Sequence, residues 1–104
     1  MIFIEAPAFE RIRGRYFDDD QYRLLQAALM ANPQAGKLIR GSGGVRKVRW
    51  AVDGKGKSGS LRVIYYWITR RNHVVLLTLY HKSEMSDLAP KEIKALAALV
   101  KSLK

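Results

Sequence analysis

Two runs of β-branched, aromatic and leucine residues in the second half of the chain most constrain how it folds. The first extends from Leu61 to Ile68 and the second from Val74 to Tyr80. Residues of these types favour strands, and the polar break between the runs, Thr69-Arg70-Arg71-Asn72, is short enough for a hairpin. The sequence therefore predicts two paired strands at the centre of a sheet.

Two further segments are predicted strands. One is the short segment from Ile2 to Ala6 at the start, and the other is Val45 to Val52, which alternates after a cluster of glycines. The segment Gly54 to Ser60 is rich in glycine and lysine and is predicted to be a loop.

Three segments are predicted helices. A short one covers Ala8 to Arg15, and a second opens at Asp18, whose spacing to Gln21 is that of a capping box, and ends at Asn32-Pro33. The last begins between Asp87 and Pro90, with Ser86 and Asp87 as its caps. We therefore expect an α+β fold: a small antiparallel β-sheet with two N-terminal helices and a C-terminal helix packed on it.

Length and composition narrow the class of protein. A chain of 104 residues suits a single domain over 1–104. It contains no cysteine, which excludes zinc ribbons, thiol nucleophiles and a disulfide scaffold. The start resembles no signal peptide and no run is long enough to span a bilayer, so we expect a cytoplasmic protein without membrane contact, metal or cofactor.

Positive charge is concentrated in the middle of the chain. The formal net charge is +10, from 19 Lys and Arg against 9 Asp and Glu. The segment from Lys37 to Arg71 carries +9 of it, as ten basic residues less Asp53. Such clusters most often contact nucleic-acid phosphates, although a solvated surface or an acidic protein partner would also explain one.

Strand pairing brings several basic residues together. If the hairpin is centred on Arg70 and Arg71, Arg62 lies opposite Leu79 or Tyr80, and the preceding strand places Arg49 near Arg62. Alternation puts Arg62, Ile64 and Tyr66 on one face, and on the next strand Leu76, Thr78, Tyr80 and, if the strand continues, Lys82. We therefore predict that four residues meet at one sheet edge beneath the Lys55/Lys57 loop, namely Arg49, Arg62, Tyr80 and Lys82.

Cations on neighbouring strands repel one another unless an anion lies between them, and a phosphate suits that position. Cleavage of RNA by its own 2′-hydroxyl needs a base, positive charge on the phosphate and an acid, which lysines and arginines can supply. The alternative is that Arg62 is a surface cation at a strand end and that the tyrosines only pack. Gly56-Lys57-Ser58 is no P-loop, because Ala51 stands where the first glycine belongs, and His73 and His81 are interpreted as structural.

Taken together, several runs resemble one known family, the RelE/HigB toxins, and most closely the HigB-type branch. The resemblance covers nearly the whole chain and rests on the order and spacing of Gly43 to Arg49, Gly54 to Gly59, Arg62 to Tyr66, Leu77 to Glu84, and Asp87-Leu88.

The resemblance implies the toxin of a type II toxin–antitoxin system that enters the ribosomal A site, cuts messenger RNA there as an endoribonuclease and inhibits translation. Lys55 and Lys57 match the family's basic loop, Arg62 its strand arginine, and Lys82 a second catalytic cation; with Tyr80 these are the expected catalytic residues. Some relatives place a base-stacking tyrosine near Leu88, a role for which Tyr80 or Tyr66 would have to substitute. We expect further residues to bind RNA, namely Arg46, Lys47, Arg49, Arg70, Arg71 and Tyr66.

The resemblance also implies partners. These are a cognate antitoxin with an acidic segment and a helix-turn-helix, messenger and ribosomal RNA, and, through the antitoxin, operator DNA. Two alternatives remain open: a ParE-like toxin that acts on DNA gyrase, and a non-catalytic basic regulator that binds RNA or DNA.

Overall fold

The central feature of the fold is the predicted hairpin, which is confirmed. In the computed structural model, which describes residues 1–51 and 61–103, β4 (Leu61–Ile68) pairs antiparallel with β5 (His73–His81). The turn between them ends at Asn72, whose φ of 54° lies in the left-handed region that asparagine tolerates. This hairpin forms the middle of a five-stranded sheet with the order β1-β5-β4-β3-β2.

The outer strands differ from prediction in two respects. On one side β3 (Arg46–Trp50) pairs antiparallel with β4, followed by β2 (Lys37–Leu38), a two-residue strand that was not predicted. On the other side β1 (Ile2–Glu5) runs parallel to β5. The sheet is therefore mixed, and the prediction of an antiparallel sheet is wrong for this pair. No turn joins β1 to β5, so no local signal indicated their relative direction.

The three predicted helices are present with small changes in their bounds. Helix α1 is Pro7–Arg13, with proline in the first turn where its missing N–H costs nothing. Helix α2 is Asp19–Ala31, and its capping box is formed as predicted, because Gln21 N donates to Asp18 Oδ1 (2.8 Å) and Asp18 N to Gln21 Oε1 (3.0 Å). Helix α3 is Pro90–Leu103. Its first turn is capped by Glu92, which accepts from Ala89 N (2.8 Å), so the prediction of Ser86 and Asp87 as caps is wrong.

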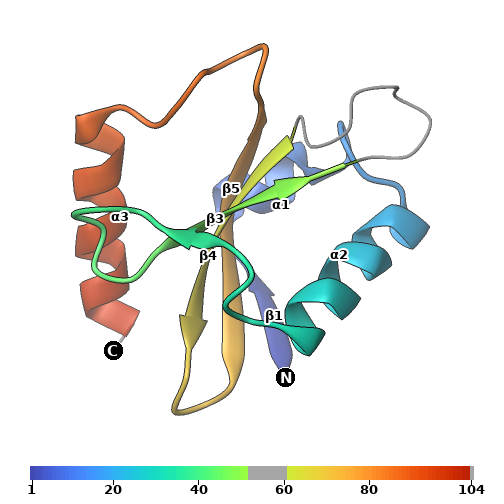
Figure 1. The fold of residues 1–104 in the computed structure, drawn as a ribbon, viewed down its shortest axis with the longest axis horizontal. Coiled ribbons are helices and arrows are strands. Elements are labelled where there is room, and N and C mark those ends of the chain that lie inside the picture. The colour runs from blue at the N-terminus through green and yellow to red at the C-terminus, as the bar shows by residue number, and fades with distance from the viewer. Residues whose placement is uncertain (52–60, 104) are drawn as a thin grey trace.

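The helices lie on both faces of the sheet, with α3 on one face and α2 on the other (Figure 1). One core cluster joins α1 and α2 to the sheet through residues such as Phe9, Leu25 and Tyr65. The other joins α3 and the β2–β3 connection to the opposite face through Ile64, Val100 and their neighbours. The expected α+β class is thus confirmed. No helix in residues 1–51 and 61–103 is long and apolar enough to span a bilayer.

A bulge in β5 decides which side chains share a face. Ile64 pairs with Thr78 whereas Tyr65 pairs with Leu76, so Leu77 is an extra residue on β5. Leu76 lies with Tyr65 in the α1/α2 core, and the prediction that it shares the face of Tyr80 is wrong. Beyond the bulge the alternation is as predicted, and Tyr80 lies on the α3 face.

Candidate nucleic-acid interface

Three of the four residues predicted to meet at one sheet edge lie side by side across three strands. Arg49 of β3 pairs directly with Arg62 of β4, and Arg62 pairs with Tyr80 of β5. Paired residues in an antiparallel sheet project to the same face, with Cβ atoms about 5 Å apart. Two guanidinium groups and a phenol are thereby held side by side on the α3 face of the sheet.

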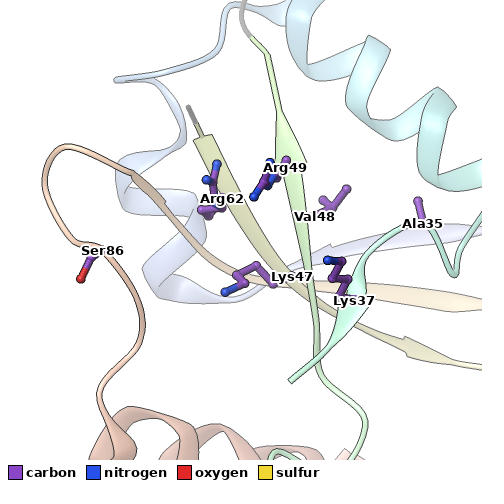
Figure 2. A pocket seen from close by; sticks show the side chains of 7 residues that line it. All are labelled: Ala35, Lys37, Lys47, Val48, Arg49, Arg62 and Ser86. Atoms are coloured by element: carbon purple, nitrogen blue, oxygen red, sulfur yellow. The ribbon is translucent and has the colours of Figure 1, made fainter. Parts of the chain in front are cut away.

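Arg49 and Arg62 border a basic hollow of about 460 Å³. Figure 2 shows four cationic side chains gathered there from β2, β3 and β4, with Ser86 across from them on the segment between β5 and α3. Lys37 enters the hollow because it pairs with Lys47. The sequence predicts Lys37 only as part of the basic segment, because a two-residue strand has no alternation to detect. The lining residues are Ala35, Lys37, Lys47, Val48, Arg49, Arg62 and Ser86.

Arg62 is not the surface cation of the alternative interpretation. Arg62 is only 9% exposed, and its Nη1 donates a hydrogen bond to the carbonyl oxygen of Leu61 (3.3 Å). Burying a guanidinium is costly unless its donors find acceptors. A long cationic side chain that is largely buried and still reaches the wall of an open hollow is suited to bind an anion there.

Tyr80 is buried next to Arg62 and has an unusual hydroxyl. Among the described residues that hydroxyl has no hydrogen-bond partner. Burial raises the pKa of Tyr80, and the carboxylate of Asp87 raises it further, while Arg62 acts in the opposite direction. Tyr80 is therefore protonated at neutral pH, and its hydroxyl is available to donate a hydrogen bond.

An ion pair connects β3 to the segment that precedes α3. Lys47 Nζ lies 3.2 Å from Oδ1 of Asp87. The same carboxylate accepts from the backbone N–H of Leu88 (2.8 Å), and this bond, followed by Lys47, lowers the pKa of Asp87. The pair holds Ser86 across from the arginines and partly neutralises one of the four cations of the hollow.

Some predicted site residues lie elsewhere. Arg70 and Arg71 are at the β4–β5 turn, at the opposite end of the strands, where Arg70 and Tyr66 line a separate hollow of about 410 Å³. Arg46 Nη1 donates to the carbonyl oxygen of Gly36 (2.7 Å) and so joins the β2 edge to β3. Lys55 and Lys57 fall outside the described residues.

Lys82 is not among the residues that line the basic hollow. Its predicted place on the face of Tyr80 required the strand to continue through Lys82, but β5 ends at His81. Lys82 is exposed in a turn stabilised on both sides. His81 Nδ1 accepts from Ser83 N (3.1 Å), and Glu84 accepts from His81 N (3.1 Å) and from the hydroxyl of Tyr16. Burial and then Glu84 raise the pKa of Tyr16 to about 12, while this hydrogen bond lowers that of Glu84.

We found no cluster of three or more His, Cys, Asp or Glu suited to a metal ion within residues 1–51 and 61–103. The charge on this surface is cationic.

Fold and hollow together define a small α+β protein with a cationic surface on one face of a mixed sheet. Comparison with known proteins identifies the class. Residues 9–104 match the family model described as the RelE toxin of the RelE/RelB toxin–antitoxin system. A mutant of the E. coli toxin RelE in the free state has a similar structure, with a TM-score of 0.57 and 13% sequence identity over 94% of both chains.

The chain belongs to the RelE toxin family. It is accordingly the toxin component of a toxin–antitoxin system, and its protein partner is a cognate antitoxin. The finer resemblance to the HigB-type branch stays a prediction.

Proposed function

We propose that the chain is a ribosome-dependent endoribonuclease that cuts messenger RNA and thereby inhibits translation. The observation that carries the proposal is the direct opposition of Arg49 and Arg62, with the unpartnered hydroxyl of Tyr80 beside them among the described residues. An RNA phosphate between the two guanidinium groups would relieve their repulsion and accept hydrogen bonds from both.

The reaction that suits this arrangement uses the RNA as its own nucleophile. The 2′-oxygen attacks the adjacent phosphorus, a P–O2′ bond forms, and the P–O5′ bond breaks. The products are a 2′,3′-cyclic phosphate and a 5′-hydroxyl. Negative charge grows on the non-bridging oxygens in the transition state, where Arg49 and Arg62 would stabilise it.

Two protons must move in this reaction, one from the 2′-hydroxyl to a base and one from an acid to the leaving 5′-oxygen. Lys55, Lys57 and Lys82 are our candidates for these roles, as the resemblance implies. Tyr80, kept protonated by its raised pKa, would donate to a phosphate oxygen or to the leaving group. The four cations of the hollow supply the charge that a metal ion provides in other nucleases, so we propose a metal-independent reaction.

Other basic residues would hold the substrate. We propose that Lys37, Lys47 and Arg46 contact the messenger backbone and that Arg70, Arg71 and Tyr66 contact ribosomal RNA. Phosphate contacts of this kind fix position without reading sequence. A ribosomal target places the protein in the cytoplasm, and an antitoxin that blocks so basic a surface should have an acidic segment, with a helix-turn-helix for operator DNA.

Induction in cells without the antitoxin tests the proposal. Growth should stop within minutes, new messenger 5′ ends should appear within translated regions, and plasmid supercoiling should stay unchanged. A change in supercoiling with intact messenger would instead show a ParE-like toxin. Normal growth at verified levels of folded protein, or binding of RNA that stays uncut on programmed ribosomes, would overturn the proposal.

A further inference from the structure

The α3 face of the sheet has an apolar surface near the β1 edge, whereas the basic hollow lies toward the β2–β3 edge. A cleft of about 380 Å³ between α3 and the start of α1 is lined mostly by small and aliphatic side chains, including Ala6, Leu77, Leu96 and Leu99. Ile2 and Ile4 share a strand face with Ala6 and extend this surface along β1. We call this surface the β1–α3 ledge, formed by Ile2, Ile4, Ala6, Leu77, Leu96 and Leu99.

The exposure of the ledge is unusual for side chains of this kind. Ile2 is 56%, Ile4 42% and Leu99 41% exposed, and these are three of the six large hydrophobic residues exposed in the described part of the chain. Scattered apolar residues on a surface are ordinary, but a contiguous group beside a cleft marks a binding site. Its apolar character excludes a polyanion such as RNA as the natural occupant.

The backbone beside the ledge is available for pairing. Within residues 1–51 and 61–103, β1 is an end strand of the sheet and has β5 as its one neighbour. Ile2 N donates to the carbonyl oxygen of Asn72 (3.2 Å) and Ala6 N to that of Leu76 (2.9 Å). Alternate residues of a strand direct their amides to opposite sides, so Phe3 and Glu5 direct theirs away from β5. A free edge of this kind readily accepts another strand.

We propose that the β1–α3 ledge is the docking surface for an extended segment of the cognate antitoxin. The segment adds a strand to the free edge of β1, bonds to the backbone of Phe3 and Glu5, and places alternate apolar side chains against Ile2, Ile4 and Leu99. The inference rests on membership of the RelE toxin family, which supplies the partner, and not on the proposed nuclease activity.

The charged residues of the toxin next to the ledge indicate which residues of the antitoxin segment flank its apolar side chains. Ile2 is bonded to Asn72, so Arg70 and Arg71 lie at the end of the ledge where β1 begins. Glu92, which lines the cleft, is already bonded to Ala89 N. The occupant that fits is therefore a peptide with acidic residues near the Arg70 end and alternating apolar residues along β1. Apolar contacts would anchor it and the acids would make binding partly salt-dependent.

Titration of the toxin with its cognate antitoxin tests the docking surface. The double variant Ile2→Glu/Ile4→Glu introduces charge where the segment would pack and should weaken the dissociation constant by ~10²-fold or more. The matched control is Leu24→Glu/Met30→Glu on α2, where both residues are 57% exposed, and it should bind within about threefold of wild type. Both variants should keep the thermal midpoint and the intrinsic activity of the free toxin.

Amide hydrogen exchange in the complex tests the strand addition. The amides of Phe3 and Glu5 should exchange more slowly when the antitoxin is bound, while that of Leu38 on the opposite sheet edge should not change. Equal affinities for the two double variants, or unprotected Phe3 and Glu5 amides in a saturated complex, would overturn the proposal. So would concentration-dependent protection of these amides in the free toxin, because a second copy would then be the occupant. If the toxin does not cleave RNA, the proposed function is wrong, but the inference about the docking surface is unaffected.

Discussion

Arg49 and Arg62 face each other directly across the β3–β4 ladder although both are cations. Like charges at directly opposed positions destabilise a sheet. Arg62 is also largely buried, which adds a desolvation cost to the repulsion. An anion bound between the two guanidinium groups would relieve this repulsion, and the functional proposal therefore depends on this pair.

Removing the charge of Arg62 should abolish cleavage. We expect Arg62→Met to lower the single-turnover rate on programmed ribosomes by ~10²-fold or more, because the growing phosphate charge loses one of its two guanidinium donors. Arg62→Lys keeps the positive charge but loses the planar guanidinium that donates two parallel hydrogen bonds, so it should restore only part of the rate. Arg23→Met, at an exposed arginine of α2, is the control. Circular dichroism must show each variant folded, and a folded Arg62→Met variant with wild-type rate would remove Arg62 from the mechanism.

Tyr80→Phe separates catalysis from stability. The substitution deletes a buried hydroxyl that has no partner among the described residues, so the free energy of unfolding should stay the same or rise slightly. If the hydroxyl donates to the phosphate or to the leaving oxygen, the single-turnover rate should nevertheless fall by roughly tenfold. Urea unfolding and cleavage are measured on the same preparation. An unchanged rate would show that Tyr80 only packs.

The basic residues should divide into two kinetic classes. Arg70 and Arg71 lie at the far end of the strands from Arg62, so their substitution should weaken ribosome binding and flatten its salt dependence without changing the saturated rate. Substitution of Lys55, Lys57 or Lys82 should lower the rate even at saturation, because an acid or base acts in the transition state. The opposite division would place the active site elsewhere.

The Lys47–Asp87 pair should make stability depend on acidity. The pKa of Asp87 is lowered from 3.8 in the folded state, so its contribution is complete above pH ~4 and is lost as the pH falls through the lower folded value. Both groups are partly exposed, so Asp87→Asn should cost less than about 1 kcal/mol at pH 7. The difference from wild type should vanish at low pH. A constant difference across the acid range in urea unfolding would contradict this assignment.

Gly36 should be indispensable for the β2 edge. A Cβ at Gly36 would lie 2.9 Å from the carbonyl carbon of Lys47 and 3.0 Å from its oxygen, which are backbone atoms that have little freedom to move. We expect Gly36→Ala to destabilise the fold by about 1–3 kcal/mol. The control Gly14→Ala meets no atom within 4 Å and has a helical φ of −65°, so it should be neutral or slightly stabilising. Equal thermal midpoints for the two variants would refute the account.

The sequence by itself determined the parts of the structure that depend on neighbouring residues. The capping box of Asp18 and Gln21 starts α2 because both hydrogen bonds close within four residues. The short turn at Thr69 to Asn72 sets the register of β4 and β5 next to it, and that register alone would pair Arg62 with Leu79. The bulge at Leu77 shifts the pairing by one residue, so that Arg62 pairs with Tyr80. The sequence therefore predicted that Arg49 lies near Arg62 and narrowed the partner of Arg62 on β5 to Leu79 or Tyr80, and the bulge decided for Tyr80.

Only the tertiary structure decided the contacts between distant segments. The parallel pairing of β1 with β5, the bulge at Leu77 and the two-residue strand β2 have no local signature, because each is set by packing against elements far away in the chain. The burial of Arg62, the Lys47–Asp87 pair and the β1–α3 ledge follow from that packing. Residue types showed that cations would gather near one end of the sheet, but which of them are buried, paired or open to a partner depends on how the layers are stacked.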